Sequence, residues 1–267
     1  MKLHTERAEV QRSNVGTETE FQIKTTAKAF DILSSGIYSD NITAIIRELS
    51  CNAYDSHVAA GKKEVPFEVH LPNNLEPFFS VKDEGVGLDH DQVMSLYTTY
   101  FDSTKTDSND FVGALGLGSK SPFSYTKAFE VISIFNGTRR MYSAFINEEG
   151  VPAIALMNEM PTDLTNGVEV KVAIKENDWN TFRYKAESVF TWFDTPPNVV
   201  GVPHFETDEL PESVLEGSNW MLIPRQRYGE KPMTAVQGNV AYNVSPDRIE
   251  EDGTQELAEL TKNVQKA

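Results

Sequence analysis

Three polar residues in one short run have the types and the spacing of a catalytic helix face. Glu48, Asn52 and Asp55 stand at i, i+4 and i+7 of the run R-E-L-S-C-N-A-Y-D, so an α-helix would place them close together. A carboxylate such as Glu48 can act as a general base toward water, and the amide oxygen of Asn52 suits magnesium. Asp55 can hold a water or the phosphate-side network of a nucleotide. Taken alone, the trio also fits an ordinary solvated helix face.

A turn with two carboxylates and two glycines, D-E-G-V-G-L, follows further along the chain. Asp83, at the end of a predicted strand, can accept a hydrogen bond from the amino group of adenine. Gly85 and Gly87 allow the backbone to approach a flat base closely, because they carry no side chain. On its own, such a sequence is also typical of a plain turn between a strand and a helix.

A glycine-rich run, V-G-A-L-G-L-G-S-K-S, spans residues 112–121. A glycine loop that enters a helix, here predicted to open at S-P-F-S-Y, favours phosphate through backbone N–H groups and the helix dipole. The run is not a P-loop, because Ser119 separates Gly118 from Lys120, and it lacks the third glycine of a dinucleotide fingerprint. Lys105 and Lys120 are nearby cations for the same phosphates.

A long amphipathic helix must position the polar trio. Ser39 or Asp40 can cap this helix, which is predicted to run to about Ala60 and to end at Gly61. The trio lies about 100° from the centre of the apolar stripe, so one flank packs on a core and the neighbouring flank presents the polar groups. The stripe consists of Ile42, Ile45, Ile46, Leu49 and Ala53.

The remaining elements predict an α+β fold. The turn sequences N-G-T, E-E-G and T-N-G join alternating apolar segments, so this part of the sheet should be largely antiparallel. Strands are expected at Phe67–Leu71, Phe78–Lys82, Phe129–Phe135, Arg139–Ile146, Val151–Asn158 and Val168–Ile174. Helices are expected at Ala27–Ser34, Asp91–Tyr100 and Asp178–Phe193.

Three regions are expected along the chain. Residues 1–20 are polar and aperiodic and predict a flexible arm. The main domain should span residues 21–195 and end at the sequence T-P-P. Residues 196–267 should form a partial second α/β unit. Outlying elements are expected at Phe21–Ile23, Trp220–Ile223, Val236–Val244 and from about Gln255.

Composition excludes several classes of protein. The chain has 267 residues, 39% of them hydrophobic, which is enough for a packed core. Its net charge of −16 argues against bulk nucleic-acid binding, because duplex-DNA binders normally carry a basic surface. The single cysteine, Cys51, excludes an internal disulfide and a Cys-rich zinc site, and it fits a reducing cytoplasm. No apolar run approaches the roughly 18 residues of a membrane helix, so no transmembrane segment is expected.

In this order, the three runs resemble the motifs of the GHKL ATPases, a family that includes gyrase, heat-shock chaperones, histidine kinases and MutL. The R-E-L-x-x-N-x-x-D run resembles the first motif, D-E-G-V-G the second, and Gly113–Ser119 the third, at the hinge of the ATP lid. The S-T-K of Ser103–Lys105 resembles the lid segment of MutL-type members. Gly167 resembles the last motif, G-T-x-V, although Val168 stands where a threonine usually helps to hold adenine.

The resemblance implies a Bergerat-type two-layer sandwich, with a mixed, largely antiparallel sheet and helices on one face, followed by a transducer-like region. It implies ATP and Mg²⁺ as ligands, with Glu48 as the catalytic residue and Asn52 as the magnesium ligand. Ser103–Asp110 should be a lid over the phosphates. The expected ATP-binding residues are Asn52, Asp55, Asp83, Gly85, Gly87, Leu88, Ser103, Thr104, Lys105, Gly113, Gly116, Leu117, Gly118, Ser119, Lys120 and Val168.

A closer resemblance links residues 20–175 to the phage rapid-lysis rIIA proteins, through K-A-F-D-I-L-S-S, A-I-I-R-E-L-S-C-N-A-Y-D and N-D-F-V-G-A-L-G-L-G-S-K-S-P-F-S-Y. That family is linked to lysis timing and to resistance against prophage exclusion. Its members are usually much longer, which implies a short relative or an N-terminal piece. The resemblance implies a location in the host cytoplasm or peripherally at the inner membrane.

Two interpretations of function remain open. The first is a slow ATPase whose nucleotide state controls lid closure and pairing into a homodimer; in MutL-like relatives an N-terminal arm packs across the partner subunit. Lys231 is a weak candidate for the activating lysine of those relatives. The second is a non-catalytic, nucleotide-gated protein that engages a host defence factor or another phage protein through an acidic surface. An intact Glu48 favours catalysis. A histidine kinase is disfavoured, because only His4 precedes the first motif.

Overall fold

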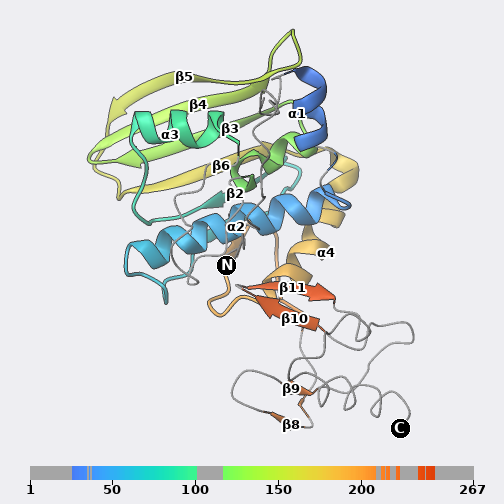
Figure 1. Ribbon diagram of the computed structural model, residues 1–267. Helices are drawn as coiled ribbons and strands as arrows, with labels where there is room; N and C mark the ends of the chain where they lie inside the picture. Colours follow the sequence, from blue (N-terminus) through green and yellow to red (C-terminus); the bar gives the residue numbers. More distant parts are fainter. Residues whose placement is uncertain are drawn as a thin grey trace, which may run out of the picture.

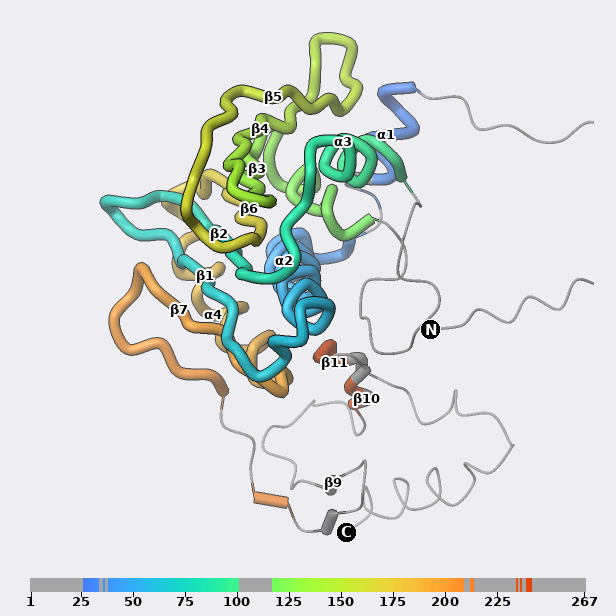
Figure 2. The backbone as a smooth tube through the Cα atoms, turned by 90° about the vertical axis from the view of Figure 1, so that its left-hand side faces the viewer, coloured from blue at the N-terminus to red at the C-terminus, as the bar shows by residue number. Residues whose placement is uncertain are grey.

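The computed structural model describes residues 26–34, 36, 38–100 and 117–208, together with the short stretches 212–213, 215–216, 221–222, 234–237 and 239–243. These residues form two layers, a sheet with helices against one face (Figure 1). The view turned by 90° shows α1, α2 and α3 on the same side of the strands (Figure 2). The elements expected at residues 1–23 and from Gln255, and the loop Ser103–Asp110, lie outside the described residues.

The main sheet has seven strands in the order β5-β4-β3-β6-β2-β1-β7. Its neighbours pair antiparallel, except that β1 and β7 are parallel. The predicted α+β class with a mixed, largely antiparallel sheet is therefore confirmed. The strands are β1 Glu68–His70, β2 Phe78–Lys82, β3 Ala128–Phe135, β4 Thr138–Ile146, β5 Pro152–Pro161, β6 Gly167–Ala173 and β7 Asn198–Val200.

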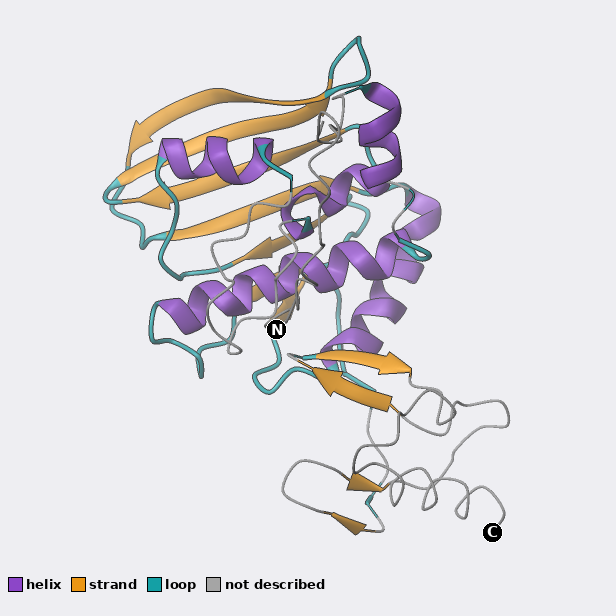
Figure 3. Cartoon of the chain, viewed as in Figure 1, coloured by secondary structure: helices purple, strands orange, loops and turns teal. Residues whose placement is uncertain are grey.

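The helices follow the predicted pattern closely (Figure 3). They are α1 Ala27–Ser34, α2 Asn41–Ala59, α3 His90–Thr98 and α4 Trp179–Phe190, with the 3-10 helices η1 Gly118–Ser124 and η2 Glu176–Asp178. Asp40 caps α2 by accepting a hydrogen bond from the Thr43 backbone N–H at 3.1 Å. Gly61 follows the helix with a φ of +70°, a conformation that glycine adopts without strain.

The core lies between the sheet and the helices. The predicted stripe of α2 faces this core: Ile45 and Ile46 are fully inaccessible to solvent, Leu49 and Ala53 are buried, and Ile42 is partly buried. Phe182 of α4 packs on Phe79 of β2 with ring centroids 5.2 Å apart. Because α2 and α4 lie side by side on this core, the sheet fixes the orientation of α2 and therefore the direction in which its polar flank points.

Three expectations need correction. The helix after the glycine run is a 3-10 helix, because Pro122 lies inside it and disfavours α-helical hydrogen bonding. The strand expected at Val236–Val244 is a hairpin, β10 Thr234–Gln237 and β11 Val240–Asn243, which turns at Asn239. The main sheet also continues past the T-P-P sequence, since β7 pairs with β1.

Two further observations complete the fold. The strands β8 Leu215–Glu216 and β9 Met221–Leu222 pair with each other in a separate small sheet. The turn between β10 and β11 contacts the end of the main domain, where the Asp194 backbone N–H donates to Asn239 Oδ1 at 3.2 Å. Among the described helices, none combines the length and apolar character needed to cross a membrane.

Candidate functional site

The helix α2 and the glycine run meet at Glu48 and Asn52. Both side chains are partly exposed, whereas Asp55 is 1% exposed and lies in the packed interior. A Cβ built on Gly118 would lie 2.8 Å from Glu48 Oε2 and 3.5 Å from Asn52 Nδ2. Only a residue without a side chain leaves the Glu48 carboxylate where it is, so the end of the predicted phosphate loop lies directly against the predicted catalytic pair.

Asp83 lies just beyond the end of β2 and is 6% exposed. Its Oδ1 accepts hydrogen bonds from Ser56 Oγ at 2.8 Å and from the Gly85 backbone N–H at 2.9 Å. The backbone N–H of Val168 also acts on the carboxylate, and no further side chain among the described residues donates to Oδ2. Burial raises the pKa of the Asp83 carboxyl above its usual value, and the hydrogen bonds from Gly85 and Ser56, followed by smaller effects of His57 and the Val168 backbone, oppose that rise. An oxygen that no side chain occupies thus lies in a largely dry setting.

The last turn of α2 and the residues just after it support the D-E-G turn through hydrogen bonds. The Glu84 backbone N–H donates to His57 Nε2 at 2.9 Å, and Lys62 Nζ donates to the Glu84 carbonyl at 2.6 Å. Because a backbone N–H is always a donor, Nε2 must be the unprotonated ring nitrogen. His57 Nδ1 therefore carries the proton and donates to the Val65 carbonyl, 2.8 Å away. Helix and turn are joined by three side chains, Ser56, His57 and Lys62.

Two glycines of the turn, and Gly167 of β6, have no room for a side chain. A Cβ on Gly85 would lie 2.1 Å from Ser56 Oγ, and one on Gly87 would lie 2.2 Å from the Ile134 carbonyl. A Cβ on Gly167 would lie 2.0 Å from the Asp83 carbonyl. Gly87 also has a φ of +70°. These close approaches bring the second and last predicted motifs into direct backbone contact.

The end of the turn is fastened to the sheet. Ser133 Oγ donates to the Leu88 carbonyl at 2.6 Å, and the Leu88 backbone N–H points back to the same hydroxyl at 3.1 Å. The Val168 carbonyl accepts from the Asp83 backbone N–H at 2.9 Å. Val168 and Ser133 are register partners in the β3–β6 ladder. Asp83, Leu88 and Val168 therefore lie together where the central strands β2, β3 and β6 end.

Arg47 and Tyr38 lie beside Glu48. Arg47 Nη2 is 2.8 Å from Glu48 Oε1, and both side chains are partly exposed. The pKa of Tyr38 is raised to about 12, first by burial and then by the negative charge of Glu48. One oxygen of the Glu48 carboxylate is thus paired with Arg47, while the other, Oε2, faces Gly118.

Lys120 is more deeply placed than a solvated cation would be. It is 2% exposed, and its Nζ lies 5.5 Å from the centroid of the Tyr100 ring. Leu117 and Ser119 beside it are also buried. The hydroxyl of Tyr100 is buried without a hydrogen-bond partner in the described residues, and burial raises its pKa to about 12. The glycine run therefore continues into a packed segment.

Five of the predicted ATP-binding residues lie outside the described residues. They are Ser103, Thr104, Lys105, Gly113 and Gly116. Most of the others fall into two groups. Asn52 and Gly118 lie with the predicted catalytic residue Glu48, and the D-E-G turn lies with Gly167 and Val168. The rest are buried: Asp55, Leu117, Ser119 and Lys120. Ser56, on the same helix face as Asn52, ties the second group to the helix that carries the first.

Sequence reasoning missed the residues that support the site. Ser56 had a usable signal, since it continues the helix face at i+4 from Asn52 and i+8 from Glu48. His57 and Lys62 follow at the end of the same helix, where polar side chains can satisfy backbone groups of a neighbouring turn. Ser133 had no such signal, because it interrupts an apolar strand and its partner is distant in sequence.

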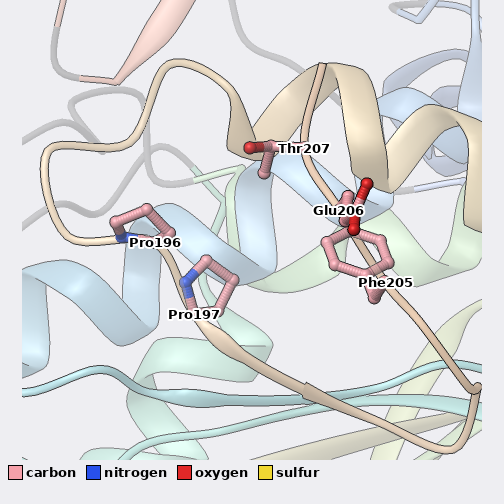
Figure 4. A pocket seen from close by; sticks show the side chains of 5 residues that line it. All are labelled: Pro196, Pro197, Phe205, Glu206 and Thr207. Atoms are coloured by element: carbon pink, nitrogen blue, oxygen red, sulfur yellow. The ribbon is translucent and has the colours of Figure 1, made fainter. Parts of the chain in front are cut away.

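A separate cavity of about 430 Å³ lies near the end of the main domain (Figure 4). It is lined by Pro196, Pro197, Phe205, Glu206 and Thr207, none of which belongs to the predicted site.

No protein-family model matches the chain. The curated proteins likewise contain no match to it.

Proposed function

We propose that this chain is an ATP-binding module of the GHKL type that hydrolyses ATP slowly with magnesium. The observation that carries the proposal is the joint placement of Asp83, with an oxygen that no side chain occupies, and of the Glu48–Asn52 pair beside Gly118. Both groups belong to one rigid frame, because Ser56 connects α2 to Asp83. Acceptor, magnesium ligand and base are thus held by the same helix.

At the adenine end, Asp83 Oδ2 would accept from the amino group of the base. Ser56 and Gly85 occupy Oδ1, so they orient the carboxylate and no side chain takes up Oδ2. Gly87 and Gly167 pack directly against the Ile134 and Asp83 carbonyls, so they fix the backbone beside which the base would lie. Val168 would offer its side chain as apolar packing, in place of a threonine hydroxyl.

At the phosphate end, Asn52 would supply an oxygen ligand to magnesium. The described residues contain no cluster of three or more His, Cys, Asp or Glu residues around one point. Magnesium is commonly held by one or two protein oxygens together with substrate phosphates and waters, and the single amide of Asn52 fits that mode. When bound, the ion neutralises charge on the phosphate oxygens.

Glu48 would act as the general base toward the attacking water. Arg47 pairs with Oε1, while Oε2 is left on the side of Gly118. The proton from water would be taken up at Oε2. Positioning and charge, rather than covalent chemistry, supply most of the rate in such reactions.

The proposed setting is a phage rIIA-like protein in the host cytoplasm or peripherally at the inner membrane. There the nucleotide state would control closure of the Ser103–Asp110 lid and pairing into a homodimer, in lysis timing or in resistance to exclusion. The alternative is a nucleotide-gated binding protein that engages a host defence factor without hydrolysis. Both alternatives share the ATP site, and they differ in whether Glu48 catalyses hydrolysis.

Calorimetric titration of the full chain with a non-hydrolysable ATP analogue tests the nucleotide site. Binding should need magnesium, and Asn52→Ala should remove most of that requirement. The matching GTP analogue is a sharp control, because guanine presents a carbonyl oxygen where adenine presents its amino group. Two acceptors would then face each other at Asp83, so equal affinity for both nucleotides would contradict the adenine assignment.

A further inference from the structure

The strand β5 forms one edge of the main sheet. It runs for ten residues, Pro152–Pro161, and within the described residues it pairs only with β4. Figure 1 shows it as the outermost strand, and the strand order places it at the opposite end of the sheet from β7. An open edge presents unpaired backbone N–H and C=O groups, on which an extended segment can add a further strand.

The direction of the backbone groups follows from the ends of the β4–β5 hairpin. The Asn147 N–H donates to the Val151 carbonyl, and the Thr162 N–H donates to the Gly137 carbonyl. Backbone groups alternate in direction along an antiparallel strand. With the irregularity opposite Tyr142 included, Ile154, Leu156 and Glu159 direct their N–H groups away from β4. The centre of the edge therefore has donors and acceptors for a new strand.

Apolar side chains are exposed along the same edge. Leu156 is 41% exposed, Met157 67% and Met160 43%, and Leu164 beyond the strand is 62% exposed. Such a grouping differs from singly scattered surface residues and is typical of an interaction site. Methionine side chains adapt readily to the shape of a partner.

Acidic residues frame this apolar edge. The segment 147–164 contains Glu148, Glu149, Glu159 and Asp163 and no Lys or Arg. Glu148, Glu149 and Asp163 are exposed, and Glu159 pairs with Arg140 of the neighbouring strand at 2.7 Å. Carboxylates of α3 add to them, since Asp89 and Asp91, together with Glu159, help to raise the pKa of Tyr142 after the larger effect of burial.

We propose that the β5 edge binds an extended segment of another protein, with an apolar centre and Lys or Arg residues at both ends, as an added strand. The apolar centre would cover Leu156 and Met157. The basic ends would meet Glu148 and Glu149 at one end of β5 and Asp163 at the other. This surface is separate from the proposed nucleotide site, which lies among α2, β2 and η1.

A second copy of this chain fits the edge poorly. In an antiparallel pair centred on Leu156, Glu149 of each copy would face Asp163 of the other, and a parallel pair would set Glu149 beside Glu149. Like charges directly opposite each other destabilise strand pairing. Each copy also carries a net charge of −16, which adds long-range repulsion.

A synthetic peptide tests the proposal directly. The probe is a fluorescent peptide of about ten residues, with alternating valine and threonine in the centre and two lysines at each end. Fluorescence anisotropy with the full chain should give saturable binding that weakens with salt. The same peptide with glutamates at its ends should bind at least about tenfold more weakly. A probe N-methylated along one edge keeps its side chains and charges but should not bind.

Charge reversal in the protein supplies the matched experiment. The double variant Glu149→Lys and Asp163→Lys should weaken the lysine probe about tenfold and strengthen the glutamate probe. The double variant Glu64→Lys and Glu176→Lys, at exposed acids in the loop after α2 and in η2, changes the net charge by the same amount and should alter neither. Leu156→Pro should abolish binding of the lysine probe, because it removes an outward N–H. Circular dichroism reports whether that variant stays folded.

Several outcomes would overturn the proposal. They are absence of saturable binding, equal affinity for lysine and glutamate probes, full binding by the N-methylated probe, and charge reversal without effect. Light scattering that shows a dimer lost in Leu156→Pro would identify a second copy as the occupant. Probe binding that appears only after removal of residues 1–25 would identify a segment of this chain. None of these results depends on nucleotide binding, so they test the β5 edge independently of the proposed ATPase function.

Discussion

Replacing Asp83 by Asn should weaken ATP binding without harming the fold, because the substitution changes only one side-chain atom, Oδ2. The Asn side chain has the same shape, and its Oδ1 can still accept from Ser56 Oγ and the Gly85 N–H, which lie at 2.8 and 2.9 Å in the native chain. The group that changes is Oδ2, which becomes an NH₂ donor and would face the amino group of adenine. Losing a hydrogen bond to a charged acceptor costs about 1.5–3 kcal/mol, so ATP affinity should fall about 10- to 100-fold.

Stability should behave differently from affinity in this variant. Burial disfavours the ionised Asp83 carboxylate and raises its pKa, so a neutral amide removes a desolvation cost at neutral pH. The melting temperature without nucleotide should therefore stay unchanged or rise. Calorimetric titration with the ATP analogue and thermal unfolding of the same sample measure both quantities. Unchanged affinity would refute the adenine assignment, and a lowered melting temperature with lost affinity would show that Asp83 serves the fold instead.

Three further predictions concern the same site. Folding raises the pKa of Asp83 above 3.8, so between 3.8 and that raised pKa the folded chain keeps a proton that the unfolded chain has lost. As pH increases through this range, the free energy of unfolding should therefore fall and the affinity for ATP should rise. Titrations at stepped pH measure both trends, and Asp83→Asn should flatten them. Gly118→Ala should displace the Glu48 carboxylate, since the new Cβ would lie 2.8 Å from Oε2, and should slow hydrolysis about 10²-fold with little change in melting temperature; an unchanged rate counts against Glu48. Hydrogen exchange of Ser103–Asp110 should slow when the ATP analogue binds, and equal exchange in both states would exclude a lid.

Elements with strong periodicity were predictable from the sequence. The stripe of α2 and its Asp40 cap are local features, and the structure has the helix at Asn41–Ala59. The strands joined by N-G-T, E-E-G and T-N-G turns were also found, because turn chemistry and alternation agree there. Where the signals conflicted, prediction failed: Pro122 turned an expected helix into a 3-10 segment, and Asn239 divided an expected strand.

The supporting residues of the site depend on long-range contacts that no local pattern records. The second motif was identified from its carboxylate and glycines, but the reason for the glycines is their packing against Ser56, Ile134 and Asp83. His57 and Ser133 serve the turn from a helix end and a distant strand. Likewise, the parallel pairing of β7 with β1 joins segments more than one hundred residues apart in the sequence, and strand partners at that separation depend on the whole topology.

Release of ADP by the purified chain, measured beside Glu48→Ala under magnesium and saturating ATP, tests the central claim most directly. The native chain should release ADP at a slow, magnesium-dependent rate. In Glu48→Ala the rate should fall about 10²- to 10⁴-fold, as expected for loss of a general base, while affinity for the ATP analogue stays within a few fold. Equal rates in the two proteins would contradict the role of Glu48, and ATP binding without any ADP release by the native chain would favour the nucleotide-gated binding protein.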